Sequence, residues 1–304
     1  IIPFLADDPS SAGGTIQELT KDRLSQGAAG NAFLLLLSDI FSIRAPELLD
    51  SLNRDMGYFP IVGAAASGHP EDKATVQWAA SRHTKHGLAG ALFSGPIQHR
   101  TRVSPGCEPI GEPFVITGAE GMVIKEIGNR PAYDTLQDAL AIFPPEEMER
   151  VSKGILAGIL FDEHKYPPKR GDYLARSIAS VDPEAGTITI VENVRPGQTL
   201  QFQVRNPSTA REELETEVRG ISWDSGLKTP LFAFYFESLG RGGRVHKEPD
   251  HDLKIIKEGL GEVPIIGFLS NAEFTPRNSR NLVHNYSAAL TVVFRQGKKS
   301  AKKK

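Results

Sequence analysis

The chain has 304 residues, of which 39% are hydrophobic and 24% charged, and its formal net charge is −2. These values are typical of a soluble globular protein with room for two domains, and they exclude a disordered or strongly basic chain. The longest apolar run, residues 32–37, is far too short to cross a membrane. No nucleic-acid partner and no membrane span are therefore expected.

The single cysteine, Cys107, limits the covalent and metal chemistry. One thiol permits no intrachain disulfide and no cysteine-based zinc cluster. This favours the cytoplasm or another reducing intracellular compartment, an organelle stroma included. The chain begins at Ile1 rather than Met, so an upstream segment with any targeting signal is expected to be missing. The lysine-rich tail 297–304 is expected to be solubilising, with a targeting or nucleic-acid role as the alternative.

The elements expected before residue 130 alternate between strands and helices. A loop with a short helix comes first, and the buried strand 31–39 is followed by an amphipathic helix over 44–56. Further strands are expected at 59–68, 75–81 and 86–95, with two short strands within 112–127.

The second part of the chain begins with helices and continues mainly with strands. Helices are expected at 129–140, 144–160, 209–218 and 250–260, the third because Thr209 and Glu212 have capping-box spacing. The strands are expected at 173–181, 187–191, 198–205, 230–238, 263–274 and 284–294.

The order of elements near the start returns near the end of the chain. A buried strand ends at Asp39 and another at Glu237, an offset of 237 − 39 = 198 residues, and a helix follows each. The next strand begins at Pro60 in one copy and at Pro264 in the other, an offset of 264 − 60 = 204 residues. The pattern predicts a diverged internal duplication.

A third strand led by histidine completes each copy, and it aligns His86 with His284. The predicted fold class is therefore α/β, with α+β as the alternative, built as two related units of mixed β-sheet flanked by helices and related by a pseudo-twofold axis. These histidines have two interpretations, because either strand-end capping or contact with a ligand would explain them.

The segment 237–252, ESLGRGGRVHKEPDHD, contains the densest polar chemistry. It joins a predicted strand to a helix, where anions bind in α/β folds. Its glycines match neither the Walker nor the dinucleotide pattern. Glu248, Asp250 and Asp252 are expected to satisfy the N–H groups at the helix start. A nucleotide is thus not expected, whereas a carboxylate ligand held by Arg241 remains open.

Metal and nucleophile chemistry are the alternatives for the polar residues of this chain. A metal could be ligated by His246, Asp250, His251 and Asp252, but Pro249 interrupts the helix that would align His246 with Asp250. Capping acids and a hydrogen-bonded histidine are expected instead. Cys107 has no base identifiable from sequence, and the usual hydrolase motifs do not occur. The sequence predicts no catalytic residue, no metal site and no cofactor.

A second polar segment, 270–285, follows another predicted strand. Asn271, Glu273, Arg277 and Asn278 lie near the strand end, where open α/β sheets place ligands. A plain surface loop would have the same polarity, so both interpretations stay open.

Several stretches in order along the chain together resemble the FIST family of sensory domains. The resemblance covers nearly the whole chain, and the joint match is specific although no single piece is. The stretches are FLLLLSDIFSI (33–43), PIVGAAASG (60–68), PGCEPIGEPFVITGAEGMVIKEIGNRPAYDTL (105–136), GDYLARSIASVDPEAGTITI (171–190), VRPGQTLQFQVRNPSTAREEL (194–214), LGRG (239–242), PDHD (249–252) and VPIIGFLSNAEFTPRNSRNLVHNYSAAL (263–290).

The resemblance implies a domain organisation and a function. Residues 1–130 would be the C-terminal part of a FIST N-like domain, and 131–304 a FIST C-like domain with its tail at 297–304. Family members are thought to bind small molecules, amino acids among them, and to pass that binding on through attached domains. This chain departs from the family pattern where Ser238 replaces a cysteine and where the glycines of 271–279 are lost. Those losses put the ligand site there in doubt.

The preferred function is a non-catalytic sensory module that binds a small polar molecule such as an amino acid. An arginine would pair with the ligand's carboxylate and an acidic residue with its ammonium group. A scaffold or protein-interaction subunit without a ligand is the first alternative, and an unrecognised hydrolase or transferase is the second. The candidate ligand contacts are Arg241, Asp250, His251, Asn271, Glu273, His284 and Asn285.

Overall fold

The computed structural model describes residues 1–25, 31–69, 71–165, 167–226, 228–241 and 248–296. These residues divide into two compact units. The first, called the core unit, comprises Ile1–Ser104 and the chain from Leu214 onward. The second, called the inserted unit, comprises Pro105–Glu213.

The core unit contains the two copies predicted from the sequence. Helix α2 forms as its sequence predicts. Leu49 and Leu52 share one buried face, and a proline occupies the first turn, where no intrahelical N–H bond is lost. In chain order the elements are β1 (Ile2–Ala6), a 3-10 turn (Pro9–Ser11), α1 (Ala12–Ser25), β2 (Ala32–Asp39), α2 (Ala45–Asp55), β3 (Ile61–Ala66), β4 (Gln77–Ala79), β5 (Arg82–Thr84), β6 (Leu88–Ser94), β7 (Ile97–Ser104), the end of α5 (Pro207–Asp224), β16 (Pro230–Ser238), α7 (His251–Leu260), β17 (Ile265–Arg277), β18 (Arg280–His284) and β19 (Ala288–Arg295).

The two halves of the core sheet have equivalent strand orders when each is followed from its outer edge to the centre. The order is β1-β6-β2-β3-β17-β16-β19-β7, with β18 paired to β17. The central pair β3 and β17 is antiparallel, while β2 is parallel to β3 and β16 is parallel to β17. Each parallel pair is then continued by an antiparallel neighbour, β6 or β19. This confirms the predicted pseudo-twofold repeat.

Two glycines mark the same backbone position in the two copies. A Cβ on Gly63 would meet the carbonyl oxygen of Leu36 at 1.9 Å, and a Cβ on Gly267 would meet that of Tyr235 at 1.6 Å. Only glycine permits this approach between neighbouring strands. The close approach explains why each copy keeps a glycine three residues after its proline. Gly63 and Gly267 are separated by the 204 residues predicted for Pro60 and Pro264 (267 − 63 = 204).

The expected pairing of His86 with His284 is wrong by two residues. The N–H of Asp39 donates to the carbonyl of Gly87, and the N–H of Ser238 donates to that of Ser287. Gly87 and Ser287 are therefore counterparts, as are Asp39 and Ser238 rather than Asp39 and Glu237. His284 instead lies at the end of β18, because β17 continues beyond the point where β3 ends and turns back as a hairpin.

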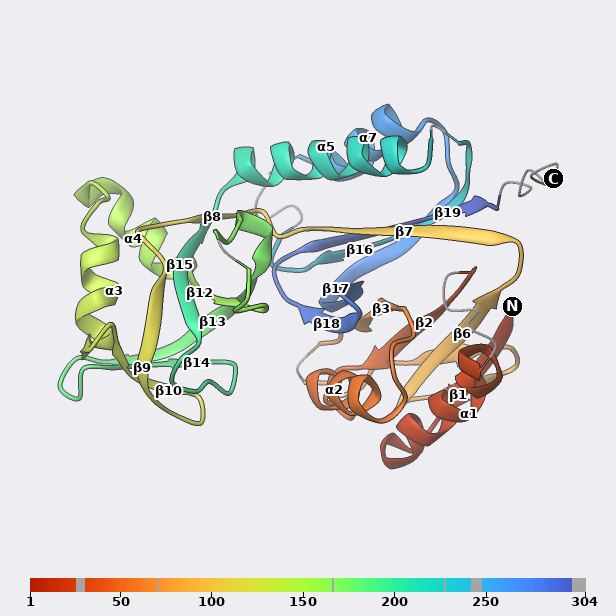
Figure 1. Cartoon of the computed structure of the whole chain (residues 1–304), viewed down its shortest axis with the longest axis horizontal. Coiled ribbons are helices and arrows are strands. Elements are labelled where there is room, and N and C mark those ends of the chain that lie inside the picture. The colour runs from red at the N-terminus through yellow and green to blue at the C-terminus, as the bar shows by residue number, and fades with distance from the viewer. Residues whose placement is uncertain (26–30, 70, 166, 227, 242–247, 297–304) are drawn as a thin grey trace, which may run out of the picture. The chain divides into compact units, whose positions relative to one another are not determined.

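An aromatic cluster shows that the core sheet bends back on itself. Phe33 on β2 and Phe234 on β16 have ring centroids 6.3 Å apart. Two strands lie between β2 and β16 in the sheet, and three strand spacings in a flat sheet would measure about 14 Å. The helix-free faces of the two halves therefore pack against each other. Helices α1 and α2 cover one outer face, and α7 with the end of α5 covers the other (Figure 1).

The inserted unit has its own eight-stranded sheet and its own core. Ile116, Leu136 and Phe202 belong to that core. The sheet order is β11-β10-β14-β13-β12-β15-β8, and β9 pairs with both β10 and β15. The elements are β8 (Cys107–Pro109), β9 (Phe114–Glu120), β10 (Val123–Ile127), β11 (Arg130–Pro131), α3 (Ala132–Leu140), α4 (Pro145–Gly154), β12 (Ile155–Leu160), a 3-10 turn (Arg170–Asp172), β13 (Tyr173–Asp182), β14 (Thr187–Ile190) and β15 (Thr199–Arg205).

Two helices differ from the expectations. The helix expected over 144–160 ends at Gly154, because Ile155–Leu160 is a fully buried strand between two others. A short apolar run cannot be assigned to helix or strand by periodicity alone. The helix expected from Thr209 begins at Pro207, because the side chain of Asn206 accepts from the N–H of Ser208 and takes the capping role.

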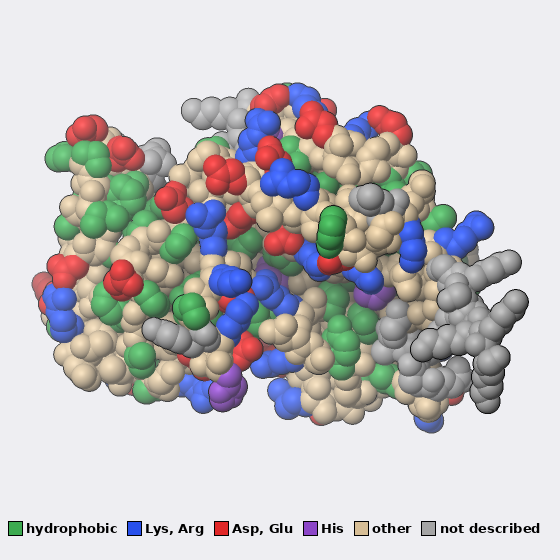
Figure 2. Space-filling view, turned by 45° about the horizontal axis from the view of Figure 1, so that its top comes forward, with side chains coloured by type: hydrophobic (Ala, Val, Ile, Leu, Met, Phe, Trp, Pro, Cys, Tyr) green, Lys and Arg blue, Asp and Glu red, His purple; other side chains and the backbone are tan. Residues whose placement is uncertain are grey.

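The surface carries charges of both signs. On the face seen in Figure 2, Lys and Arg side chains are interspersed with Asp and Glu. In the part of the chain described, no helix combines the length and apolar character that a membrane crossing requires.

Asn281 on β18 bonds to α2 and to the start of β3. Its side-chain oxygen accepts from the N–H of Ile61 at 2.9 Å, and its amide nitrogen donates to the carbonyl of Phe59 at 3.0 Å and to the side chain of Asn53 at 3.2 Å. One carboxamide thus satisfies a backbone donor and a backbone acceptor on the side of β3 that faces away from β2. Asn281 is 3% exposed, so water cannot replace it.

Replacing Asn281 with alanine is expected to lower the free energy of unfolding by about 2–4 kcal/mol. The change leaves the N–H of Ile61 and the carbonyl of Phe59 buried without a partner. Urea denaturation measures the loss. Asn285→Ala is the matched control, because that half-buried side chain makes one long bond, 3.3 Å, to the carbonyl of Asn271. Equal losses for the two variants would contradict the role given to Asn281.

Candidate functional site

A cavity of about 600 Å³ lies in the core unit beside α7 and β17. We call it the α7–β17 cavity. It is lined by the end of β16, by the beginning of the parallel strand β17 and by α7. Its wall combines apolar side chains with acidic and basic ones. The lining residues are Tyr235, Glu237, Glu248, Pro249, Asp250, His251, Asp252, Leu253, Lys257, Glu262, Val263, Ile265, Gly267, Phe268 and Leu269.

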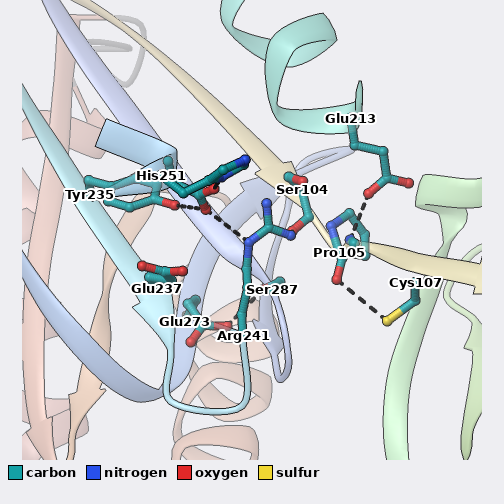
Figure 3. A network of polar contacts seen from close by, with 12 residues as sticks. Ser104, Pro105, Cys107, Glu213, Tyr235, Glu237, Arg241, His251, Glu273 and Ser287 are labelled. Atoms are coloured by element: carbon teal, nitrogen blue, oxygen red, sulfur yellow. Dashed lines mark hydrogen bonds and ion pairs between the residues drawn. The ribbon is translucent and has the colours of Figure 1, made fainter. Parts of the chain in front are cut away.

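A buried ion pair fixes one side of this cavity. Tyr235, Arg241 and His251, all labelled in Figure 3, each form a hydrogen bond with the carboxylate of Asp252. The hydroxyl of Tyr235 donates to Oδ2 at 2.5 Å and Nε of Arg241 donates to the same oxygen at 3.0 Å. Nδ1 of His251 lies 2.8 Å from Oδ1. Both carboxylate oxygens are therefore engaged.

Arg241 also ties the strand β16 to the far edge of the sheet. Its Nη1 donates to the carbonyl of Ser104, the last residue of β7, at 3.2 Å. The side chain is 1% exposed, so its charge is balanced inside the protein rather than by water. The short turn between Ser238 and Arg241, closed by a backbone hydrogen bond, brings it back under α7.

The electrostatics of this network keep it ionised. Burial opposes ionisation of Asp252, but the charge of Arg241 and the donated hydrogen bonds outweigh it, so the pKa of this carboxyl lies below its ordinary range. Burial, followed by the Asp252 charge, raises the pKa of Tyr235 well above its ordinary value. Tyr235 therefore stays a neutral donor, and the network is a fixed support.

A second buried cluster centres on Glu273 of β17. Its two carboxyl oxygens lie 2.6 Å from Oγ of Ser270 and 2.7 Å from Oγ of Ser287. The side chain is fully buried, and burial raises the pKa of this carboxyl to about 8. Ser270 Oγ also lies 3.2 Å from the carbonyl of Glu237. A protonated Glu273 can thus donate to Ser270 while Ser270 donates to that carbonyl.

The remaining candidates lie around the β17–β18 hairpin. Nε2 of His284 is 2.8 Å from the hydroxyl of Thr275, and the ring is buried. Asn285 donates to the carbonyl of Asn271, whose side chain is exposed. Of the predicted site residues, Asp250 and His251 line the cavity, and Arg241 supports it through Asp252. Asn271, Glu273, His284 and Asn285 are not among the residues that line it.

The acids at the start of α7 do not cap it as the sequence suggested. Asp250 occupies the cap position with φ at +57°, and its side chain accepts no capping hydrogen bond. Asp252 is turned inward to the network instead. His246 lies outside the described residues. Among the residues that are described, no group of three or more His, Cys, Asp or Glu side chains is arranged to hold a metal.

Cys107 is buried on β8, and its thiol contacts the carbonyl of Pro105 at 3.4 Å.

Sequence reasoning missed several residues of the cavity. Lys257, Val263 and Ile265 carry no motif, since they are an exposed helix cation and two strand-flanking aliphatic residues. The internal repeat is the one sequence feature that points to these residues, because it makes them equivalent to residues of the first copy that bond to Asn281.

The core unit is thus a mixed sheet of two related halves, and its second half carries the cavity. Residues 4–130 match the FIST N domain and residues 132–276 match the FIST C domain, so the chain belongs to the FIST family. FIST domains are associated with sensory and signal-transduction roles. Each match contains one parallel strand pair of the core sheet, β2–β3 in the first and β16–β17 in the second.

Similar proteins occur in mycobacteria. Uncharacterized protein Rv0628c of Mycobacterium tuberculosis is 35% identical over 258 residues, which cover 85% of this chain and 67% of that protein. Uncharacterized protein Mb0898c of Mycobacterium bovis is 34% identical over 259 residues, covering 85% of this chain and 66% of that protein. The chain thus spans about two thirds of the length of these relatives.

Proposed function

We propose that this chain is a non-catalytic sensory module that binds a small polar molecule, such as an amino acid, in the α7–β17 cavity. The observation that carries the proposal is the cavity itself. Its volume of about 600 Å³ suits a small ligand, and it lies between the start of α7 and the first residues of β17.

The residues of the wall give the cavity two chemical sides. Asp250 and His251 offer polar contacts at the start of α7, and the ring of His251 is oriented by Asp252. Ile265 and Leu269 offer an apolar surface on β17. A ligand with a charged head and a short side chain fits this combination.

The ion pair of Arg241 and Asp252 gives the site its rigidity. Both side chains are buried and mutually bonded, and a ligand group that took Arg241 away would leave Asp252 uncompensated. Arg241 therefore serves the ligand by positioning His251 through Asp252. The Glu273 cluster holds the adjoining part of β17 in the same way, through Ser270 and Ser287.

His251→Ala is expected to weaken binding of the amino acid that stabilises the wild type most by about three- to tenfold, the value of one hydrogen bond. Thermal shift with an amino-acid panel selects the ligand, and calorimetry then compares dissociation constants. The control is His83→Ala, which changes an exposed histidine on β5 outside the cavity lining. A panel without any shift, or equal affinities for the two variants, would overturn the proposal.

A further inference from the structure

The pseudo-twofold repeat gives the α7–β17 cavity a counterpart in the first copy. Helix α2 and strand β3 correspond to α7 and β17, and Gly63 is equivalent to Gly267 at an offset of 204 residues (267 − 63 = 204). At the same offset, the buried Leu52 of α2 corresponds to the buried Ile256 of α7, and Leu49 corresponds to the partly buried Leu253. The two grooves between helix and strand are thus equivalent positions.

In the first copy this groove is occupied by a carboxamide. Asn281 accepts from the N–H of Ile61, donates to the carbonyl of Phe59 and contacts the side chain of Asn53. The offset of 204 residues between Gly63 and Gly267 assigns Val263 and Ile265 to Phe59 and Ile61, and the same offset along the helix assigns Lys257 to Asn53. All three line the cavity.

The backbone N–H groups of the second copy have the same orientation as those of the first. In the first copy the N–H of Leu34 donates to the carbonyl of Pro60, and the N–H of Ile61 is directed outward from β2 to Asn281. In the second, the N–H of Ala233 donates to the carbonyl of Pro264. Because successive residues of a strand bond to alternate sides, the N–H of Ile265 is directed away from β16.

We infer that the α7–β17 cavity recognises a primary carboxamide, and that its ligand is an amino acid with such a side chain, asparagine or glutamine. This inference rests on the proposed function and deepens it. The amide oxygen of the ligand accepts from the N–H of Ile265, and its NH₂ group donates to the carbonyl of Val263, as Asn281 does in the first copy.

The same pair of backbone groups provides selectivity against close analogues. A carboxylate of the same shape has two acceptors, so one oxygen would face the carbonyl of Val263 and repel it. An aliphatic side chain of similar size would leave the N–H of Ile265 unpaired. Sites built around such a donor and acceptor discriminate strongly against analogues that lack the matching group.

Calorimetry on the whole chain with free amino acids tests the selectivity. Asparagine or glutamine is expected to bind at least tenfold more tightly than aspartate, glutamate and leucine. Protein labelled with ¹⁵N-isoleucine adds a direct readout, in which the amide resonance of Ile265 shifts on saturation and that of Ile61, already bonded to Asn281, does not. An acidic or aliphatic amino acid that binds equally well or better, or an unmoved Ile265 resonance, would overturn the inference.

A substitution that restores the chemistry of the first copy gives an independent test. Lys257→Asn recreates the contact of Asn53 and is expected to tighten carboxamide binding about three- to tenfold, the value of one added hydrogen bond. Lys228→Asn is the control, because it removes an exposed lysine outside the cavity lining. Equal or weaker binding by Lys257→Asn than by the control would count against the inference.

The outcomes separate this inference from the proposed function. Binding of some amino acid that His251→Ala weakens, without preference for a carboxamide, retains the ligand site and refutes its assigned chemistry. No binding of any amino acid refutes both.

Discussion

Arg241→Met is expected to lower the free energy of unfolding by about 3–5 kcal/mol, the cost of leaving one partner of a buried ion pair alone. Asp252 would keep its hydrogen bonds from Tyr235 and His251 but would lose the charge that keeps it ionised. Both partners are almost wholly buried, so solvent screening does not reduce the effect. Urea denaturation at neutral pH measures the loss.

Two further variants show whether the loss comes from the unpaired charge. Arg241→Met combined with Asp252→Leu is expected to recover part of the stability, because no charge then remains buried. Arg130→Met is the control, because its pair with Asp138 is exposed, and it is expected to cost at most about 1 kcal/mol. A loss below 1 kcal/mol for Arg241→Met would contradict the account of the network.

Glu273→Gln is expected to change how stability depends on pH. Burial raises the pKa of Glu273 from its ordinary value of 4.5 to about 8 in the folded protein. Between these values the folded chain binds more protons at this site than the unfolded chain does, so stability falls as pH rises. The wild type should lose roughly 1 kcal/mol per pH unit across this interval, or several kcal/mol in total.

The glutamine variant lacks this titration but keeps the shape and the hydrogen bonds to Ser270 and Ser287. Urea denaturation from pH 5 to pH 8 measures the free energy of unfolding of both proteins. The decline with pH should be smaller for the glutamine variant, by the loss expected above for the wild type. Glu258→Gln, a change at an exposed residue of α7, is the matched control. Parallel curves for the wild type and Glu273→Gln would show that the buried carboxyl does not titrate in this range.

The repeat was predictable because it rests on local signals. Pro60 and Pro264 open equivalent strands, and Gly63 and Gly267 each permit a carbonyl to approach too closely for a Cβ. Such backbone requirements keep the same amino acid at equivalent positions of both copies. The register of the third strand was not predictable, because His86 and His284 suggested an alignment that the longer β17 hairpin breaks.

The inserted unit and the edge strand β7 were harder to recognise. Residues 97–104 on β7 are mostly polar and half-buried, so their sequence resembles a loop. The strand Ile155–Leu160 follows a helix directly and is apolar throughout, so its sequence extends the helical pattern. In both segments the tertiary pairing decides the structure.

The site was predictable in part. The sequence marked Arg241, Asp250 and His251 as a polar group beside a strand end, and the fold places them at or beneath one cavity. It could not show that Arg241 and Asp252 satisfy each other, because that contact depends on how the chain returns under α7. The apolar residues that line the cavity could not be recognised, because their sequence does not differ from that of ordinary buried strand residues.

We propose above that the α7–β17 cavity holds a small polar ligand. A crystal structure of the protein saturated with the amino acid that raises its melting temperature most tests this claim directly. The account predicts ligand density in that cavity, within hydrogen-bond distance of His251 and of the Ile265 N–H. Ligand density elsewhere, with only water in the cavity, would contradict it.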